Sequence, residues 1–184
     1  MSTLTDTPRI YVACLAAYNN GFLHGAWIDA DQDVDDIQAK VRAMLKTSPA
    51  WQLGDICEEW AIHDYEGFGD IQLSEWEDFE TVATLGEAIA DHGPAFTQYY
   101  ATFTYGDCVA DTVAQFKEDY RGTWNSESMF VEQCLEDDGT LDAVEAAGLN
   151  PSYIDLEAIA RDWFINDYFS APAPNYQVFV YHRS

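Results

Sequence analysis

The chain has 184 residues, of which 33 are Asp or Glu and only 8 are Lys or Arg, so its formal net charge is -25. A content of 48% hydrophobic and 15% aromatic residues excludes an intrinsically disordered acidic tail and indicates a folded protein. Because so few cations are available to neutralise phosphates, we expect no direct binding to nucleic acid, and the expected partners are basic.

Two short runs of aromatic and β-branched residues, 9–15 and 22–28, predict the first strands. The turn residues Asn19-Asn20-Gly21 lie between them, so we expect a hairpin. Residues 57–65 (CEEWAIHDY) alternate in polarity and predict a further strand.

An amphipathic segment follows the hairpin and predicts a helix that begins after an Asp33 cap and ends before Pro49. Residues 74–120 predict a run of short helices, the first with Ser74 and Glu77 as a capping box. The expected breaks between these helices are at Gly86, Gly93-Pro94 and Gly106.

The last third of the chain repeats two short patterns of the first third. Residues 121–124 repeat the G-x-W of residues 24–27, and four of the seven residues in 162–168 are identical to those in 59–65. We expect residues 176–182 to form the final strand and the preceding SAPAPN stretch to be a loop.

These elements predict an α+β fold built as an elongated row of three modules. The expected modules are an N-terminal α+β module of residues 1–70, a helical acidic middle module of residues 71–120 and a C-terminal α+β module of residues 121–184.

No apolar run approaches the roughly 18 residues of a membrane span, and the first residues lack the basic head and apolar stretch of a signal peptide. We therefore expect a cytoplasmic protein. The four cysteines form no CxxC pair, so the sequence predicts buried free thiols rather than a zinc or redox site. These cysteines are Cys14, Cys57, Cys108 and Cys134.

The acids are concentrated in a segment without any base. Between Lys46 and Lys117 lie 70 residues with no Lys or Arg. Ordinary surfaces mix both signs of charge, so this segment is either an adaptation for solubility or salt, or a surface selected for negative potential. Its 14 acids are the residues expected to bind a partner in the second case: Asp55, Glu58, Glu59, Asp64, Glu66, Asp70, Glu75, Glu77, Asp78, Glu80, Glu87, Asp91, Asp107 and Asp111.

The charge is comparable with that of DNA. A net charge of -25 equals that of roughly 43 Å of B-DNA, which carries about one charge per 1.7 Å of axis. A compact chain of this length has a radius of gyration of only about 16 Å. If the protein imitates the rod shape of a DNA duplex, we therefore expect it to be elongated and dimeric.

No pattern in the sequence predicts catalysis, a cofactor or a metal. The acids of residues 29–36 resemble a calcium loop, but Val34 stands where the loop needs Gly and Lys40 where it needs Glu. The four histidines, His24, His63, His92 and His182, are scattered without ligand spacing.

Four segments of the chain carry a resemblance to a known family. They are RIYVACL at 9–15, LHGAWID at 23–29, EEWAIHDYEGF at 58–68 and FINDY at 164–168. These segments resemble the ArdA family of antirestriction proteins. The similarity runs from about residue 9 to 182 and is most specific in EEWAIHDYEGF.

The resemblance implies an elongated dimer of three-module subunits that mimics bent B-DNA and occupies the DNA-binding groove of type I restriction-modification enzymes. With this resemblance, the 14 acids between Lys46 and Lys117 are the expected phosphate mimics. It implies that the protein protects mobile genetic elements in a new host. It also assigns residues 126–139 to an antirestriction motif near the dimer contact. The residues expected there are Ser126, Glu127, Phe130, Glu132, Leu135, Glu136, Asp137 and Asp138.

Alternatives remain for both the motif and the function. Phe130, Cys134 and Leu135 are spaced as in an ordinary amphipathic helix, so the motif is either an interface or only core. The chain is alternatively a general acidic module that sequesters basic DNA-binding proteins, or a salt-adapted enzyme. The cations expected at a dimer contact, by elimination, are Lys117, Arg121 and Arg161.

Overall fold

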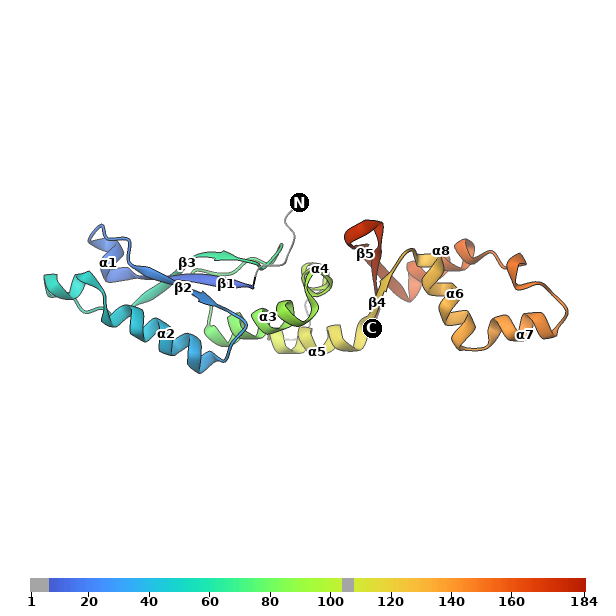
Figure 1. Ribbon diagram of the computed structural model, residues 1–184, viewed down its shortest axis with the longest axis horizontal. Coiled ribbons are helices and arrows are strands. Elements are labelled where there is room, and N and C mark those ends of the chain that lie inside the picture. The colour runs from blue at the N-terminus through green and yellow to red at the C-terminus, as the bar shows by residue number, and fades with distance from the viewer. Residues whose placement is uncertain (1–6, 104–107) are drawn as a thin grey trace. The chain divides into compact units, whose positions relative to one another are not determined.

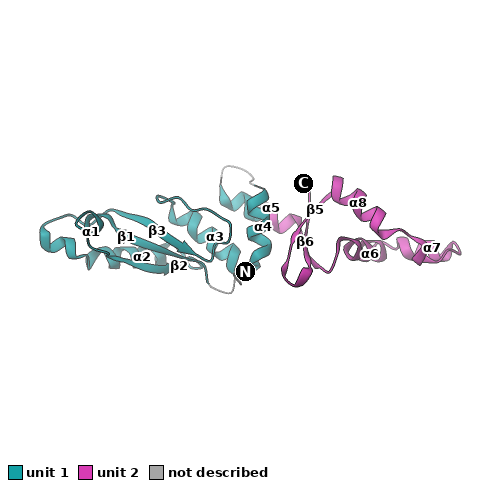
Figure 2. Ribbon diagram, turned by 90° about the horizontal axis from the view of Figure 1, so that it is seen from above, with its two compact units in different colours: residues 1–114 teal, residues 115–184 magenta. Residues whose placement is uncertain are grey.

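The computed structural model describes residues 7–103 and 108–184 (Figure 1). Its helices and two three-stranded antiparallel sheets confirm the predicted α+β class. The chain divides into two compact units, residues 1–114 and 115–184 (Figure 2). The boundaries of the three predicted modules stay a prediction.

Unit 1 contains sheet A, in which β1 (Arg9–Cys14) lies between β2 (Gly25–Asp29) and β3 (Trp60–Glu66). Both neighbours are antiparallel to β1, which confirms the predicted hairpin and third strand. The connection between the first two strands differs from the prediction, because it contains a short helix, α1 (Leu15–Asn19). Gly21 follows this helix with a φ of 80°, a conformation that favours glycine.

The helix α2 (Val34–Lys46) packs against sheet A through Ile37 and Val41, both buried (Figure 1). Asp33 precedes it as predicted, but its side chain makes no capping hydrogen bond. Its carbonyl oxygen instead accepts hydrogen bonds from the N–H groups of Asp36 and Ile37. The 3₁₀ helix η1 (Pro49–Leu53) follows.

After β3 and a loop of residues 67–78, unit 1 continues with the helices α3 (Phe79–His92), α4 (Pro94–Thr102) and the beginning of α5 (Val109–Asp119). The predicted break at Gly93-Pro94 is confirmed, and Gly106 lies outside the described residues. The predicted break at Gly86 is wrong, because α3 continues through it.

Gly86 serves a close contact instead of a break. A Cβ atom at this position would stand 2.3 Å from the carbonyl oxygen of Ala30, so only glycine lets α3 approach that backbone. The predicted helix start at Ser74 is also wrong. Ser74 N–H does donate to Glu77 Oε2 at 3.1 Å, but the pair forms a turn, and Asp78 is the residue that caps α3.

Unit 2 contains sheet B, in which β6 (Val178–His182) lies between β4 (Tyr120–Trp124) and β5 (Tyr168–Pro172). All pairs are again antiparallel. The predicted SAPAPN loop is partly wrong, because its first three residues belong to β5. Pro172 is tolerated there because β5 is an edge strand and Pro172 is its last residue.

Between β4 and β5 the chain forms α6 (Glu127–Asp137), α7 (Thr140–Ala146) and α8 (Leu156–Asn166). Two 3₁₀ helices complete the unit, η2 (Pro151–Tyr153) and η3 (Pro174–Tyr176).

The two predicted repeats have different outcomes. Both G-x-W patterns lie in strands, β2 and β4, each followed by a helix. The second sequence repeat has no structural counterpart, because residues 60–65 form a strand whereas residues 162–166 form the end of α8. Trp163 and Phe164 pack from that helix against the core of unit 2, a position that an aromatic residue fills as well from a helix as from a strand.

Candidate protein-interaction surface

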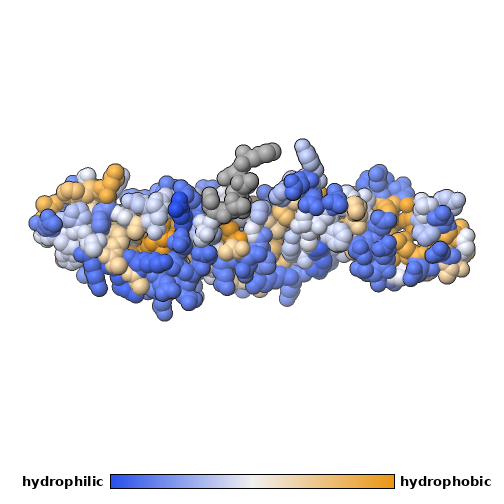
Figure 3. Space-filling model, in the orientation of Figure 1, coloured by the Kyte–Doolittle hydropathy of each residue, from blue (hydrophilic) through white to orange (hydrophobic). Residues whose placement is uncertain are grey.

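The structure exposes most of the predicted phosphate mimics, and hydrophilic residues cover much of the face of the molecule that Figure 3 shows. Asp55 and Glu77 are half-buried, and Asp107 lies outside the described residues. The exposed members are Glu58, Glu59, Asp64, Glu66, Asp70, Glu75, Asp78, Glu80, Glu87, Asp91 and Asp111. Their carboxylates are thus available to a partner, and they arise from β3, its flanking loops, α3 and α5.

Sheet A brings some of these acids together on one side. In the register of the sheet, Arg9 pairs with Asp29 and Glu66, and Tyr11 pairs with Trp27 and Asp64. Paired residues, and residues two apart in a strand, point to the same face. We call this face, opposite the one that α2 covers, the open face. Its residues are Arg9, Tyr11, Trp27, Asp29, Asp64 and Glu66.

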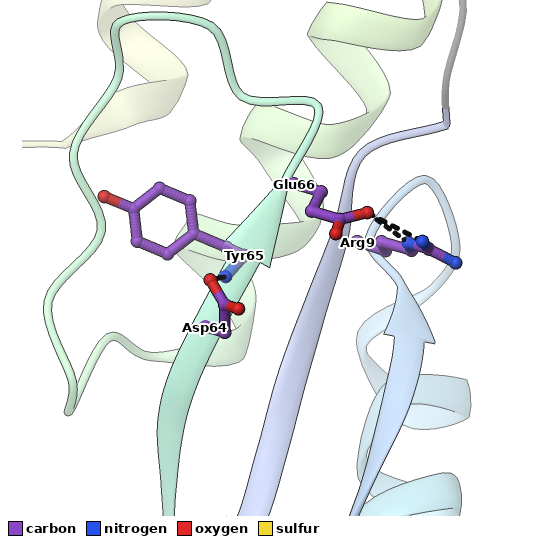
Figure 4. A network of polar contacts seen from close by, with 4 residues as sticks. All are labelled: Arg9, Asp64, Tyr65 and Glu66. Carbon is purple, nitrogen blue, oxygen red and sulfur yellow. Dashed lines mark hydrogen bonds and ion pairs between the residues drawn. The ribbon is translucent and has the colours of Figure 1, made fainter.

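The polar contacts of the open face leave it net negative (Figure 4). Arg9 Nη2 and Nε donate to Glu66 Oε2 at 2.6 Å and 3.0 Å. Asp64 Oδ1 accepts a hydrogen bond from the Tyr65 N–H at 2.8 Å, which fixes that carboxylate against its own strand. The open face carries the three carboxylates of Asp29, Asp64 and Glu66 and one guanidinium, that of Arg9. Its formal charge is therefore about -2.

Asp78 is held at the beginning of α3. Its Oδ1 accepts from the Thr81 N–H at 2.8 Å and its Oδ2 from the Thr81 hydroxyl at 3.0 Å. The hydrogen bond from the Thr81 amide lowers the pKa of Asp78 below its ordinary value. A negative charge here also interacts favourably with the positive end of the helix dipole.

The other acids of α3 form a line. Glu80, Glu87 and Asp91 are spaced by seven and four residues, so they follow one side of the helix. At 1.5 Å per residue, Glu87 and Asp91 lie about 10 Å and about 16 Å from Glu80 along the axis. A helix therefore presents carboxylates at intervals that a flexible acidic loop would not fix.

A cavity of about 650 Å³ lies beside the first turn of α3. Its wall includes Glu77, Asp78, Glu80 and Tyr100. Burial raises the pKa of the Tyr100 hydroxyl, and the negative charge of Glu77 adds to the effect. The phenol is therefore neutral at physiological pH, and the negative charge of the wall comes from the carboxylates.

The predicted antirestriction motif falls on α6 and its flanks. Ser126 caps the helix by accepting from the Met129 N–H at 3.1 Å. Glu127 is half-buried and accepts from the Ser170 hydroxyl at 2.6 Å. Phe130 and Leu135 are buried in the core of unit 2. The remaining predicted residues are exposed: Glu132, Glu136, Asp137 and Asp138.

Three side chains of this region define the two sides of α6. Hydrogen bonds from Thr140 lower the pKa of the Asp138 carboxyl. Burial raises the pKa of the Cys134 thiol, with Asp137 and Asp138 adding to it. Met129 is 46% exposed and was not predicted as a surface residue of the motif. The structure thus gives α6 an apolar core side and an acidic outer side.

The cysteines are less uniformly buried than predicted. Cys14 and Cys57 are buried and Cys134 is half-buried, but Cys108 is exposed. The prediction of a buried thiol is wrong for Cys108. This residue lies just before the first residue of α5, so it is not part of the helix. Among residues 7–103 and 108–184, no three His, Cys, Asp or Glu side chains are placed to hold a metal ion. No helix in the same part of the chain has the length and apolarity needed to cross a bilayer.

Sequence reasoning missed the aromatic part of the open face. Trp27 is 39% exposed and its ring centroid lies 5.5 Å from that of Tyr11. Gly25 makes room for Tyr11, because a Cβ there would come within 2.7 Å of the Tyr11 ring. The alternation of Arg9 with Tyr11 and of Trp27 with Asp29 would have indicated this face once the hairpin register was known.

Comparison with family models matches residues 10–177 to the family described as Antirestriction protein (ArdA). Comparison with curated proteins gives no match.

Proposed function

Since the chain belongs to the ArdA family of antirestriction proteins, we propose that it acts by mimicking B-DNA and blocking the DNA-binding groove of type I restriction-modification enzymes. Its exposed carboxylates stand in for phosphates and meet the Lys and Arg side chains of a basic channel. Such complementary potentials accelerate encounter and favour the correct partner.

The observation that carries this proposal is the exposure of acids over 70 residues that contain no Lys or Arg. The hydrogen-bonded Asp78 and the line of Glu80, Glu87 and Asp91 support it, because they hold negative charge at fixed positions along a helix. No base edges are present, so the proposed interaction reads no DNA sequence.

The proposal includes an elongated homodimer in the cytoplasm, with residues 126–139 near the dimer contact. The acidic outer side of α6 opposes self-association, since unpaired like charges are costly to bury. The exposed Met129 supplies an apolar point of contact on this helix. A Met129→Glu change is expected to shift the sedimentation coefficient from dimer to monomer, whereas Glu132→Gln is the matched control that retains the dimer.

The test is a titration of the protein into a complex of a type I methyltransferase core with its DNA. We expect stoichiometric displacement of DNA at physiological salt, without DNA binding or cleavage by the protein. A protein that displaces DNA equally from unrelated basic DNA-binding proteins would be a general acidic sequestering module. A folded dimer that displaces nothing would contradict the proposal, and folding that requires molar salt would favour a salt-adapted enzyme.

Grouped substitutions locate the effective acids. Neutralising Glu80, Glu87 and Asp91 together to Gln, Gln and Asn is expected to weaken displacement and to reduce the slope of log affinity against log salt. The matched control neutralises three exposed acids of unit 2 outside the predicted antirestriction motif, which are Glu145, Glu157 and Asp162. Equal loss in both variants would mean that total charge matters and the position of the acids does not.

A further inference from the structure

The open face of sheet A already binds one guanidinium group, that of Arg9. The Arg9 Cζ atom lies 4.8 Å from the centroid of the Trp27 ring, within cation–π distance. The same group donates two hydrogen bonds to Glu66. An aromatic ring on one side and a carboxylate on the other is the arrangement that selects Arg over Lys. The planar guanidinium can stack on the ring and donate two hydrogen bonds to the carboxylate, whereas the ammonium group of Lys cannot.

This face has negative charge and ring surface beyond what Arg9 satisfies. Asp29 and Asp64 pair in register with Arg9 and Tyr11 and are both exposed. Trp27 retains 39% exposure although Arg9 lies over it. An exposed Trp beside carboxylates contributes nothing to phosphate imitation, because a phosphate backbone has no rings. The charge complementarity of the face therefore points to a cation that also stacks.

We propose that the open face of sheet A is an arginine-binding surface, on which a partner arginine stacks on the Trp27–Tyr11 pair and forms ion pairs with Asp29 or Asp64. The proposal rests on the proposed function for the identity of the partner and adds a preference for arginine over lysine. Arg9 lies over the same Trp27 ring and opposes the incoming cation by like charge, so the partner arginine stacks on the part of the ring pair that stays exposed.

The preference is measured without any restriction enzyme. Full-length protein is titrated calorimetrically with two peptides of equal length, one of arginine only and one of lysine only, at physiological ionic strength. We expect the arginine peptide to bind roughly 3- to 10-fold more tightly. Equal affinity for the two peptides would overturn the proposal.

Substitution of the ring assigns the preference to this face. Trp27→Leu is expected to remove the preference and to leave lysine-peptide affinity almost unchanged, while Trp27→Tyr retains part of it. The matched control is Trp51→Leu, which changes a 46% exposed tryptophan of η1 outside the open face. A Trp27→Leu variant that keeps the preference, with native circular dichroism, would overturn the proposal. If that variant does not fold, Trp27→Tyr decides the matter by the same ratio.

Two charge variants give opposite changes. Asp64→Asn is expected to weaken both peptides to a similar extent, about 2- to 5-fold, because it removes charge and leaves the rings. Arg9→Gln is expected to strengthen the arginine peptide by about the same factor, because it removes a competing cation. Weaker binding of the arginine peptide by Arg9→Gln would contradict the role given to this residue.

The same variants in the DNA-displacement titration separate the two proposals. Trp27→Leu is expected to weaken displacement roughly 5-fold without changing the salt slope, since a ring releases no counterions. If the wild-type protein displaces no DNA but prefers the arginine peptide, only the proposed function is contradicted. Displacement by wild type and Trp27→Leu alike, with no arginine preference, would contradict only the further inference.

Discussion

The two sheets have one plan and two different environments. In each, a central strand lies between two antiparallel neighbours. In sheet A, α2 covers one face and the other presents charged and aromatic residues to solvent. In sheet B, α6 and α8 pack on one face, while Phe116 from α5 packs on the other against Tyr120 and Tyr181.

The burial of the two central strands differs over part of their length. From Arg9 to Val12, β1 alternates exposed or half-buried with buried residues, as a half-covered strand does. Its last three residues, Val12, Ala13 and Cys14, are buried consecutively, as Phe179, Val180 and Tyr181 of β6 are. Unit 1 has 20 of the 33 acids and unit 2 has 13. A sheet with one solvated face can position charge for a partner, and a sheet covered on both faces can only support the helices that carry charge.

The largest effect on stability is expected from a substitution on the side of sheet B that Phe116 covers. Phe116 is fully buried between rings, so Phe116→Ala is expected to lower the free energy of unfolding of unit 2 by about 3–5 kcal/mol. Trp27→Ala on the open face is expected to cost far less, about 1 kcal/mol. Urea denaturation of both variants checks this contrast, and equal losses would contradict it.

A smaller effect on stability is expected at the contact between Gly86 of α3 and the backbone of Ala30. Gly86→Ala places a methyl group against the Ala30 carbonyl and is expected to destabilise by about 1–3 kcal/mol. Gly139→Ala is the comparison in unit 2. A Cβ atom at this position would have no other atom within 4 Å, so the substitution adds only the backbone strain of a residue with a φ of 79°. That strain costs about 1 kcal/mol. Thermal unfolding of both variants measures the difference, and a neutral Gly86→Ala would refute the close contact.

The Asp78 cap is expected to contribute about 0.5–2 kcal/mol, which Asp78→Ala removes and Asp78→Asn largely keeps. The pKa of Asp78 is lower in the folded chain than its ordinary value of 3.8. Its carboxylate therefore stabilises the fold fully above pH 3.8, and this contribution is lost as the pH falls through the folded pKa. The stability of wild type relative to Asp78→Asn, measured by urea denaturation from neutral to acidic pH, should fall in that window. A constant difference would contradict the assignment.

The smallest expected effect concerns a single exposed acid. Glu87→Gln on α3 is expected to change the free energy of unfolding by less than about 0.5 kcal/mol and DNA displacement by at most about 1 kcal/mol. Parallel denaturation and displacement titrations measure both. Abolished displacement by this one change, with an intact fold and dimer, would mean that the affinity is concentrated in one carboxylate.

Local patterns predicted much of this fold. The turn at Asn19-Asn20-Gly21 and the alternation around Ile62 predicted the strands of sheet A, and the apolar spacing of Ile37 and Val41 predicted α2. Gly86 was misjudged because a glycine that breaks a helix and one that permits a close contact are identical in sequence. Only the partner backbone at Ala30, distant in the chain, distinguishes them.

The candidate surface was predicted by charge and not by register. Composition alone predicted that acids such as Glu66 and Asp64 would be exposed, since few groups are available to pair with them. It did not predict that Trp27 would lie beside Arg9 on the same face, because this depends on which residues of two strands are paired. The predicted antirestriction motif shows the same limit, because the spacing of Phe130 and Leu135 predicted a core side and leaves the dimer contact a proposal.

The order of the strands has a consequence for synthesis on the ribosome. The central strand of sheet A is its first in the chain, so each later strand of unit 1 finds its pairing partner already made. The central strand of sheet B is its last, so β4 and β5 wait with unpaired edges until residues 178–182 emerge. A ribosome that stalls shortly before this point would therefore display a finished unit 1 beside a unit 2 that is open to misassembly and proteolysis.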